Sequence, residues 1–314
     1  MKILITGGLG FIGCNFVEYF LGKRKKDKIV VVDKCTYAAN KRKLDEFKHF
    51  KNFKFYKEDI TNLKAMDRIF KREKFDYVLN FAAETSVDRS FLSPELFFDV
   101  NVNGVINLLK LSRLYLVKRF HQISTDEVYG DLALDSKKIF KETDQLNPKN
   151  PYSLSKATAD EYILMFHKIY GYDVTISRST NNYGPYQAKD KLIPLVIARA
   201  NMNAEIPIYG TGNNMRNWLY VYDHCVAIDK IFEFGKSGEI YNIGTTETYD
   251  NLYIVHHILD YMKKDYKLIK FVSDRLVHDQ KYNLDCSKIK KELDFEPVYN
   301  LEAALDDTID SYLK

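Results

Sequence analysis

The stretch KILITGGLGFIG, at residues 2–13, decides the fold because it joins a short β-branched strand to a glycine-rich turn and the start of an apolar helix. Glycines at such a junction permit a tight turn and let backbone amides approach a pyrophosphate, whose negative charge the helix N-terminus favours. The spacing matches the dinucleotide-binding fingerprint, which requires this strand-to-helix context. The glycines that carry the pattern are Gly7, Gly8, Gly10 and Gly13.

Asp33 ends the second β-branched run, twenty residues after Gly13. A carboxylate at this position accepts hydrogen bonds from both ribose hydroxyls of the adenosine half and repels the extra phosphate of NADP. NAD is therefore the predicted cofactor, although Lys34 next to Asp33 tempers the discrimination. The alternative is a packing turn with a solvated acid, and the combination of spacing and position favours the cofactor site.

Short β-branched runs alternate with longer amphipathic stretches over the first 180 residues. This alternation predicts an α/β fold of Rossmann type, a doubly wound parallel sheet with helices on both faces and ligands at the carboxyl ends of its strands. The expected strands are residues 2–6, 29–33, 53–59, 77–83, 120–125 and 173–178, and the expected helices include residues 11–21, 95–117 and 152–170.

The residue pattern changes near residue 180, where a polar segment precedes shorter, mixed elements. This change predicts a smaller C-terminal α/β lobe that binds the substrate. We expect domains at residues 1–180 and 181–314, with an approximate boundary and with segments that can interleave. Because no Pro- or Ser-rich linker separates the two parts, they are expected to share one cleft.

The composition argues against several classes of protein. The 47 Lys and Arg against 43 Asp and Glu leave a net charge of +4, and the basic residues are scattered apart from the run at residues 23–28, so nucleic-acid binding is not expected. The cysteines show no disulfide or zinc-site spacing, and no metal is expected. The chain opens on a strand and has no run of membrane-spanning length, which predicts a cytoplasmic protein. The cysteines are Cys14, Cys35, Cys225 and Cys286.

Tyr152 and Lys156 are four residues apart in PYSLSK, so both side chains lie on one face of the helix expected at residues 152–170. A nearby ammonium favours the phenolate and lowers the pKa of Tyr152, which can then take a proton from a sugar hydroxyl. Such a pair also occurs by chance on amphipathic helices. Together with the glycine turn upstream, it indicates an NAD-binding enzyme that acts on a hydroxyl group.

Asp126 and Glu127 stand side by side in QISTDEVYG, where a strand is expected to end. Two close carboxylates repel each other, and in a desolvated site the charge of the first to ionise raises the pKa of the second. The pair then titrates as a unit and holds one acid and one base. The alternative is a loop with two solvated acids, and the presence of Tyr152 favours the functional pair.

A series of motifs runs along nearly the whole chain in matching order and spacing. On these motifs the sequence resembles the dTDP-glucose 4,6-dehydratases, within the extended short-chain dehydrogenase/reductase superfamily. The motifs are TGGLGFIG, FAAETSVDRS, ISTDEVYGD, NPYSLSK, STNNYGPYQAKDKLIPLVI, IPIYGTGNNMRNWLYVYDH, EIYNIG and DRLVHDQKYNLD.

The resemblance implies a role for each of five catalytic residues. Enzymes of this family oxidise carbon 4 of a nucleotide-linked glucose, remove water across carbons 5 and 6, and return the hydride to carbon 6. Tyr152 would be the base for the carbon-4 hydroxyl, Thr125 would hydrogen-bond the same oxygen, and Lys156 would hold the ribose and tune Tyr152. Glu127 would take the proton from carbon 5, and Asp126 would protonate the departing hydroxyl of carbon 6.

The resemblance also implies two sets of binding residues. The expected NAD contacts are Gly7, Gly10, Phe11, Ile12, Gly13, Asp33, Lys34, Asp59, Ile60, Ala82, Ala83, Tyr152, Lys156 and Asn182. The expected nucleotide-sugar contacts are Thr85, Asp88, Thr125, Asn181, Lys191, Leu192, Pro207, Tyr209, Arg216, Asn251, Arg275 and His278. Guanidinium groups at Arg216 and Arg275 suit the two charges of a pyrophosphate. For each residue taken alone, a surface salt bridge, or for His278 a structural role, is the alternative.

The chain departs from the family pattern at several positions. Ser86 stands where the family usually has His, Val100 where it has Thr, and Asn217 where it has Asp. Leu276-Val277 replace a Pro-Gly pair in the loop expected to close over the nucleotide, which puts the base preference in doubt. None of these departures removes a proposed catalytic group.

These observations predict an NAD-dependent nucleotide-sugar 4,6-dehydratase that acts on dTDP-glucose in deoxysugar synthesis, such as the route to rhamnose. The alternatives are the same reaction on UDP-glucose, a nucleotide-sugar 4-epimerase, and an NAD-binding regulatory or scaffold protein. An epimerase has no use for the Asp126-Glu127 pair, and the complete catalytic set argues against a silent scaffold. A homodimer through the two long helices is expected because both carry apolar residues on more than one face.

Overall fold

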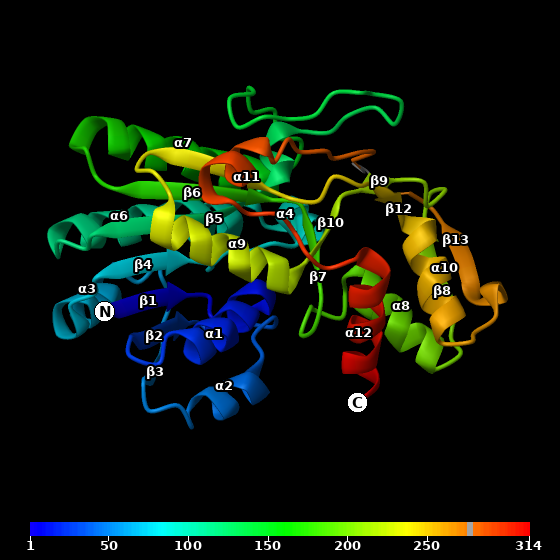
Figure 1. The fold of residues 1–314 in the computed structure, drawn as a ribbon, viewed down its shortest axis with the longest axis horizontal. Helices are drawn as coiled ribbons and strands as arrows, with labels where there is room; N and C mark the ends of the chain where they lie inside the picture. Colours follow the sequence, from blue (N-terminus) through cyan, green and yellow to red (C-terminus); the bar gives the residue numbers. More distant parts are fainter. Residues whose placement is uncertain (275–278) are drawn as a thin grey trace.

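The computed structural model describes residues 1–274 and 279–314. A seven-stranded parallel sheet forms its centre, with the strand order β11-β6-β5-β4-β1-β2-β3 (Figure 1). The doubly wound Rossmann-type sheet is therefore confirmed, and its strand order reverses between β1 and β4. The strands are β1 (Lys2–Thr6), β2 (Lys28–Asp33), β3 (Phe53–Lys57), β4 (Tyr77–Asn80), β5 (Arg119–Thr125), β6 (Val174–Ser179) and β11 (Glu239–Ile243).

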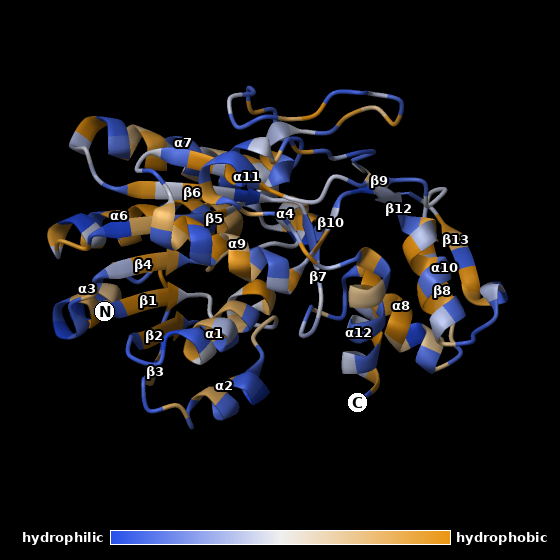
Figure 2. Ribbon diagram, in the orientation of Figure 1, coloured by the Kyte–Doolittle hydropathy of each residue, from blue (hydrophilic) through white to orange (hydrophobic). Residues whose placement is uncertain are grey.

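The pleat of the central strands divides their apolar side chains between two helical layers. Ile3 and Ile5 face the layer of α1, α2 and α9, whereas Leu4 between them faces the layer of α3, α6 and α7. Figure 2 shows the apolar colour of β1 between these layers. The covering helices are α1 (Phe11–Lys23), α2 (Lys41–Phe47), α9 (Val221–Phe234), α3 (Leu63–Glu73), α6 (Gly104–Leu114) and α7 (Pro151–Tyr170).

The prediction of a single helix at residues 95–117 is wrong. The segment forms α5 (Pro94–Phe98), a π-helical turn η1 (Asp99–Asn103) and α6. The extra residue of the π turn accompanies the buried Asn101. Its Oδ1 accepts from the backbone N–H of Glu84 at 2.9 Å, and its Nδ2 donates to the carbonyl of Glu84 at 3.0 Å and to the hydroxyl of Ser155 at 2.9 Å. This side chain ties the chain after β4 to α7.

The C-terminal part of the chain builds a smaller lobe with its own apolar core. Figure 1 shows this lobe beside the carboxyl ends of the central strands. Residues 221–243 instead join the large sheet through α9 and β11, so segments after residue 180 enter both parts, and the division at that residue stays a prediction. The remaining elements are α4 (Val87–Leu92), η2 (Asp126–Tyr129), β7 (Asn181–Tyr183), α8 (Leu192–Asn201), β8 (Ile206–Tyr209), β9 (Met215–Arg216), β10 (Trp218–Tyr220), β12 (Tyr249–Asp250), α10 (Asn251–Tyr261), η3 (Tyr266–Leu268), β13 (Ile269–Val272), α11 (Ser287–Leu293) and α12 (Leu301–Leu313).

A buried ion pair fastens α7 to the sheet beneath the site described below. Asp160 Oδ2 of α7 lies 2.9 Å from Arg178 Nε of β6, and both side chains are at most 1% exposed. The hydroxyl of Ser124 on β5 donates to the same carboxylate oxygen at 2.9 Å, and Arg178 Nη1 donates to the phenol of Tyr129 at 2.9 Å. The pair therefore joins β5, β6, η2 and α7.

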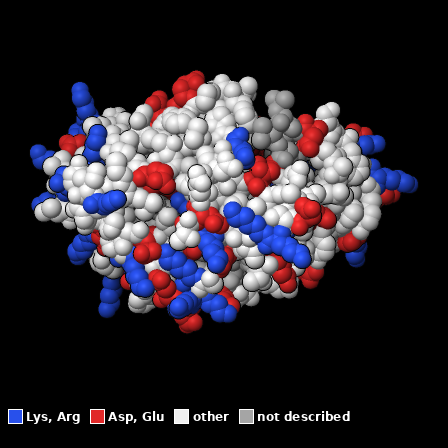
Figure 3. Space-filling view, turned by 90° about the horizontal axis from the view of Figure 1, so that it is seen from above, with Lys and Arg blue, Asp and Glu red and all other residues white. Residues whose placement is uncertain are grey.

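Charges of both signs are interspersed on the face of the molecule shown in Figure 3. The basic run at residues 23–28 lies at the end of α1 and in the following loop, where Arg24 pairs with Asp229 of α9 at 2.8 Å and also with Glu233. Over residues 1–274 and 279–314, no helix is long and apolar enough to cross a bilayer. The same residues contain no cluster of side chains that could hold a metal ion.

Candidate active site

Two glycines shape the turn between β1 and α1. Gly7 has φ of 66°, in the left-handed region that favours glycine, and a Cβ there would lie 2.5 Å from the backbone nitrogen of Ala82. A Cβ on Gly13 would lie 2.2 Å from the carbonyl oxygen of Gly7. Gly10 gives α1 no side-chain cap, which leaves the helix N-terminus suited to a phosphate group. The turn therefore has the geometry that its sequence predicts.

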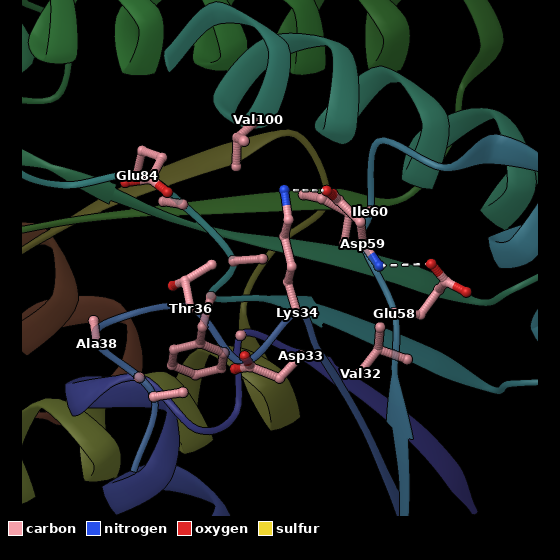
Figure 4. A pocket seen from close by; sticks show the side chains of 16 residues that line it. Val32, Asp33, Lys34, Thr36, Ala38, Glu58, Asp59, Ile60, Glu84 and Val100 are labelled. Carbon is pink, nitrogen blue, oxygen red and sulfur yellow. Dashed lines mark hydrogen bonds and ion pairs between the residues drawn. The ribbon is translucent and has the colours of Figure 1, made fainter. Parts of the chain in front are cut away.

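A cavity of about 100 Å³, here called the Asp33 cavity, opens at the carboxyl ends of β1 to β4 (Figure 4). The Asp33 carboxylate accepts from the backbone N–H of Leu9 at 3.0 Å and of Cys35 at 2.7 Å. Burial raises the pKa of Asp33, and the two amide hydrogen bonds oppose that rise. The carboxylate is thus fixed beside the glycine turn, as recognition of a ribose requires.

Lys34 does not extend as a free cation into this cavity. Its Nζ lies 2.7 Å from Asp59 Oδ2, and Figure 4 shows the side chain reaching toward Asp59. The hydrogen bond that Lys34 donates to Asp59 raises the pKa of Lys34. Because its charge is already paired, Lys34 offers less help to a 2′-phosphate than its place in the sequence suggests, which favours NAD over NADP.

The expected NAD contacts divide into two groups. Those that line the Asp33 cavity are Gly7, Gly10, Asp33, Lys34, Asp59, Ile60, Ala82 and Ala83. Those that do not line it are Phe11, Ile12, Gly13, Tyr152, Lys156 and Asn182. The lining, a glycine turn beside a fixed buried carboxylate, fits the adenosine half of a dinucleotide. The individual contacts stay predictions.

The acidic pair begins where β5 ends. Thr125 is the N-cap of η2, and its Oγ1 accepts from the backbone N–H of Glu127 at 3.3 Å while donating to Asp126 Oδ1 at 3.2 Å. Asn150, the N-cap of α7, donates from Nδ2 to Glu127 Oε2 at 3.3 Å. Asp126 is 3% exposed, and its Oδ2 has no hydrogen-bond partner in the described structure. The pair is therefore not a loop of two solvated acids.

Burial acts on both carboxyls of the pair. It raises the pKa of Asp126 to about 8, with a further contribution from the charge of Glu127. Burial also raises the pKa of Glu127, and the charge of Asp279 adds to that rise. At neutral pH Asp126 therefore holds a proton, which is the state that a general acid needs.

Tyr152 and Lys156 lie on the first turns of α7, which begins with Pro151 after an Asn150–Ser153 capping box. Lys156 Nζ donates to the carbonyl of Ile123 at 2.5 Å, and burial lowers the pKa of Lys156 to about 8. The two residues share one face of α7, as expected from their spacing, and this face meets the end of β5.

The expectation that Lys156 lowers the pKa of Tyr152 is wrong for this structure. Tyr152 is 8% exposed, and burial raises its pKa, with further increases from the charges of Glu127 and Asp126. A hydrogen bond with Thr125 opposes the rise. Desolvation thus outweighs the stabilisation of the phenolate, because Lys156 directs its ammonium at a backbone carbonyl.

A second cavity, of about 450 Å³, lies between the acidic pair and the smaller lobe and is here called the Glu127 cavity. Segments far apart in the sequence meet in it, since its lining runs from the end of β4 to the chain before α11. The expected nucleotide-sugar contacts in its lining are Thr85, Asp88, Asn181, Lys191, Leu192, Pro207, Tyr209, Arg216 and Asn251. Asn182, expected at the cofactor, also lines it, Thr125 does not, and Arg275 and His278 lie outside the described residues.

Arg216 makes its hydrogen bonds to backbone carbonyls in this structure. Its Nη2 donates to Asp279 O at 2.8 Å, and its Nη1 donates to Met215 O at 2.9 Å and to Gln280 O at 3.3 Å. Its guanidinium carbon lies 5.1 Å from the ring centroid of Tyr282. Arg216 is thus held at the wall of the cavity by the segment that precedes α11.

Two departures from the family pattern lie at the two cavities. Ser86 lines the Glu127 cavity, and its hydroxyl accepts from the backbone N–H of Arg89 at 3.4 Å to cap α4. Val100 lines the Asp33 cavity, where a threonine would offer a hydroxyl. The two replacements change which hydrogen bonds a ligand can make at these points.

Asn217 has a structural role of its own. Its Oδ1 accepts from Thr245 N at 2.8 Å, and its Nδ2 donates to Thr245 O at 2.6 Å and to Glu247 O at 3.0 Å. An aspartate could accept the first bond but could not donate the other two. Leu276-Val277 lie outside the described residues.

Sequence reasoning missed several residues of the Glu127 cavity. They come from segments whose pattern reads as core strand or loop, so only the fold reveals that they meet there. QAKD in the polar segment after β7 was the one local signal, because it clusters polar residues beside Lys191. The missed residues include Gln187, Asp190, Trp218, Asp279 and Tyr282.

The fold is a doubly wound dinucleotide-binding sheet, and a buried tyrosine and lysine lie four residues apart at the edge of a shared cleft. These features define an extended short-chain dehydrogenase/reductase. The family model described as GDP-mannose 4,6 dehydratase matches residues 4–308. The dTDP-glucose 4,6-dehydratase of Haemophilus influenzae is 40% identical over 100% of this chain and 98% of its own. The chain therefore belongs to the nucleotide-sugar 4,6-dehydratase family.

Solved structures agree with this assignment. The crystal structure of dTDP-glucose 4,6-dehydratase from Bacillus anthracis, in complex with NAD, has a TM-score of 0.93 and 39% identity, covering 100% of this chain and 96% of that one. The enzyme of the same name from Streptomyces venezuelae, with NAD bound, has a TM-score of 0.95 and 36% identity, covering 100% and 97%.

Proposed function

We propose that this chain catalyses the NAD-dependent dehydration of dTDP-glucose to dTDP-4-keto-6-deoxyglucose, a step of deoxysugar biosynthesis such as the route to rhamnose. The observation that carries the proposal is the pair formed by the buried Asp126 and the half-buried Glu127, beside Tyr152 at the edge of the Glu127 cavity. An oxidation or an epimerisation at carbon 4 needs one base, whereas an elimination needs a base and an acid together. The pair supplies both.

The first step is oxidation at carbon 4. Tyr152 would take the proton of the carbon-4 hydroxyl, Thr125 would hydrogen-bond the same oxygen, and Lys156 would hold the ribose of the cofactor. When bound, NAD supplies a hydride acceptor for carbon 4 and later a hydride donor for carbon 6. Because burial raises the pKa of Tyr152 in the free protein, the phenolate has to be stabilised as the ligands bind.

The second step is elimination across carbons 5 and 6. The new ketone makes the proton at carbon 5 acidic, and Glu127 would take that proton. The electron pair forms the carbon–carbon double bond while the carbon-6 hydroxyl leaves with a proton from Asp126, so one water is released. The raised pKa of Asp126, about 8, supports this direction of proton transfer.

The nucleotide end would occupy the outer part of the Glu127 cavity. Lys191 and Arg216 are its cations among the described residues, and they would face the pyrophosphate. The names of the relatives favour dTDP-glucose, with UDP-glucose as the alternative substrate. The remaining alternatives are a 4-epimerase and an NAD-binding regulatory or scaffold protein.

A homodimer through α6 and α7 forms part of the proposal. These helices turn part of their apolar residues to the sheet and leave others exposed. The exposed set is Leu114 at 65%, Met165 at 43%, Ile169 at 60% and, just after α6, Leu116 at 86%. An apolar surface of this kind fits a second copy of the chain. The four cysteines are free thiols, which fits the proposed cytoplasmic location.

One assay tests the proposed reaction. Purified protein with NAD is incubated separately with dTDP-glucose, UDP-glucose and UDP-galactose, and the products are weighed by mass spectrometry. We expect dTDP-glucose to lose one water. No dehydration of any sugar would contradict the proposal, and an isomer of unchanged mass would favour the epimerase.

Glu127→Gln separates the two steps. The variant keeps Tyr152 and Thr125, so oxidation at carbon 4 proceeds, but it lacks the base for carbon 5. We expect turnover to fall by about 10³-fold or more, with the fluorescence of reduced nicotinamide appearing on addition of dTDP-glucose. Unimpaired turnover would show that Glu127 is not the base.

A further inference from the structure

Among the described residues, Glu127 shares its cavity with three other carboxyl side chains, Asp88, Asp190 and Asp279. Asp279, in the segment that leads to α11, lines this cavity together with Glu127, Arg216 and Tyr282. Asp279 lies in the DRLVHDQKYNLD motif directly after His278, but the sequence assigns it no role of its own. The fold places it in the same cavity as Glu127, because the segment before α11 closes one wall of that cavity.

Asp279 is held at two points. The phenol of Tyr282 donates a hydrogen bond to Asp279 Oδ2. The backbone carbonyl of Asp279 accepts from Arg216 Nη2 at 2.8 Å and from Asn214 Nδ2 at 3.1 Å. Tyr282 is 3% exposed and is packed under the guanidinium of Arg216. The Asp279 carboxylate is therefore held in one position at the cavity wall.

The groups around Glu127 come from several elements. Asn150, the N-cap of α7, donates a hydrogen bond to Glu127. After burial, the charges of Glu127 and Asp126 raise the pKa of Tyr152. After burial, the charge of Asp279 contributes most to the raised pKa of Glu127, whereas Asn150, Lys191 and Arg216 lower it. The same three carboxyls act on the buried phenol of Tyr282, whose pKa is raised by burial and further by the charges of Glu127, Asp279 and Asp126.

We propose that Asp279, fixed by the phenol of Tyr282, is a positioning residue for the elimination and acts on Glu127 through its negative charge. The inference rests on the proposed function, in which Glu127 takes the proton from carbon 5. That transfer converts a carboxylate into a neutral acid and so removes one negative charge from a cavity whose wall also holds Asp279. Asp279 thereby favours the protonated product of the step, and it offsets Lys191 and Arg216, which favour the ionised base.

The direct test measures the proton affinity of Glu127 without turnover. Protein with ¹³C-labelled glutamate carboxyls is titrated by NMR, and the Glu127 resonance is assigned by its loss in Glu127→Gln. We expect Asp279→Asn to lower the pKa of Glu127 by about one unit, with the same fall in Asp279→Ser, a second neutral variant. Asp279→Glu keeps the charge and should keep the raised pKa.

Asp190→Asn is the matched control, because Asp190 lines the same cavity but its charge is not among those that act on Glu127. It should leave the pKa of Glu127 within a few tenths of a unit. A pKa that is indifferent to Asp279→Asn, or that moves as far in Asp190→Asn, would overturn the inference.

Kinetics give the second arm. With dTDP-glucose, Asp279→Asn should slow elimination about 10-fold, shift the acidic limb of the pH profile to lower pH, and leave oxidation at carbon 4 unchanged. Equal loss in both steps, with an unmoved pH limb, would mean a purely structural role. A wild-type protein that dehydrates no sugar but shows the pKa dependence would contradict the proposed function alone, whereas active protein without that dependence would contradict only this inference.

Discussion

Two buried carboxyls on the same side of the sheet have opposite surroundings. Asp160 is fully buried on α7 and pairs with Arg178 at 2.9 Å, while Asp126 is 3% exposed and contacts no cation at ion-pair distance within the described chain. Adjacent residues of β5 donate hydrogen bonds to the two acids, Ser124 to Asp160 and Thr125 to Asp126. One strand end therefore supports two carboxyls with different partners.

The difference teaches that the partner, more than burial, decides what a buried carboxyl does. Asp160 faces a guanidinium, and its charge is needed to compensate that buried cation. Asp126 faces the like charge of Glu127, which adds to the effect of burial and raises its pKa to about 8. The first arrangement stabilises the fold, and the second stores a proton at a cost in stability.

Asp126→Asn should have the largest effect and should separate activity from stability. Removing the proton donor is expected to slow dehydration by about 10³- to 10⁴-fold, which corresponds to about 4–5.5 kcal/mol in the barrier. The same substitution should raise the free energy of unfolding at pH 7 by about 2–4 kcal/mol, because the variant no longer has to hold a proton that the unfolded chain releases. Steady-state turnover and urea unfolding measure the two effects.

The pH dependence fixes the sign of this prediction. The folded pKa of Asp126, about 8, lies above the ordinary value of 3.8, so between these two pH values the folded state binds a proton that the unfolded state lacks. Stability contributed by this group is therefore present below about pH 4 and is lost as the pH rises toward 8. The free energies of unfolding of wild type and Asp126→Asn should differ least near pH 4, and the difference should grow as the pH rises. If the free energies of unfolding of the two proteins changed in parallel with pH, Asp126 would not hold a proton in the folded state at neutral pH.

Asp160→Asn should have the next largest effect, and on stability. It leaves Arg178 as an uncompensated buried cation and is expected to lower the free energy of unfolding by about 3 kcal/mol. Asp160→Leu combined with Arg178→Met, which removes both charges, should recover most of that loss. Urea unfolding of the three proteins checks the prediction, and a single variant as stable as wild type would show that the pair is not the fastening of α7.

The local part of the site could be predicted from the sequence, because adjacent or helically spaced residues encode it. The glycine turn with Asp33 and the acidic pair all lie where the sequence analysis puts them relative to the strands. In each case strand ends and helix periodicity fix the relative positions of side chains without help from distant segments.

The remainder depends on tertiary structure. Asp160 and Arg178 read as ordinary charges of an amphipathic helix and a strand, and nothing local indicates that they pair in the core. Asp279 comes from a segment about 150 residues beyond Glu127 and meets it only when the smaller lobe folds against the sheet. The pKa of Tyr152 was predicted with the wrong sign, because spacing reports the neighbouring ammonium but not the burial.

Ser124→Ala should have the smallest effect and tests whether the two acids are independent. The variant removes the hydroxyl that donates to Asp160 Oδ2 but leaves the bond from Arg178 Nε to the same oxygen, so we expect a loss of about 1 kcal/mol in the free energy of unfolding. Turnover should stay within two-fold of wild type, because Thr125 still serves Asp126. A double-mutant cycle with Asp160→Asn should recover nearly all of the loss as coupling. If turnover instead fell by ten-fold or more while stability held, Ser124 would act on the catalytic acid, and the separation between a stabilising and a proton-storing carboxyl would fail at the strand end they share.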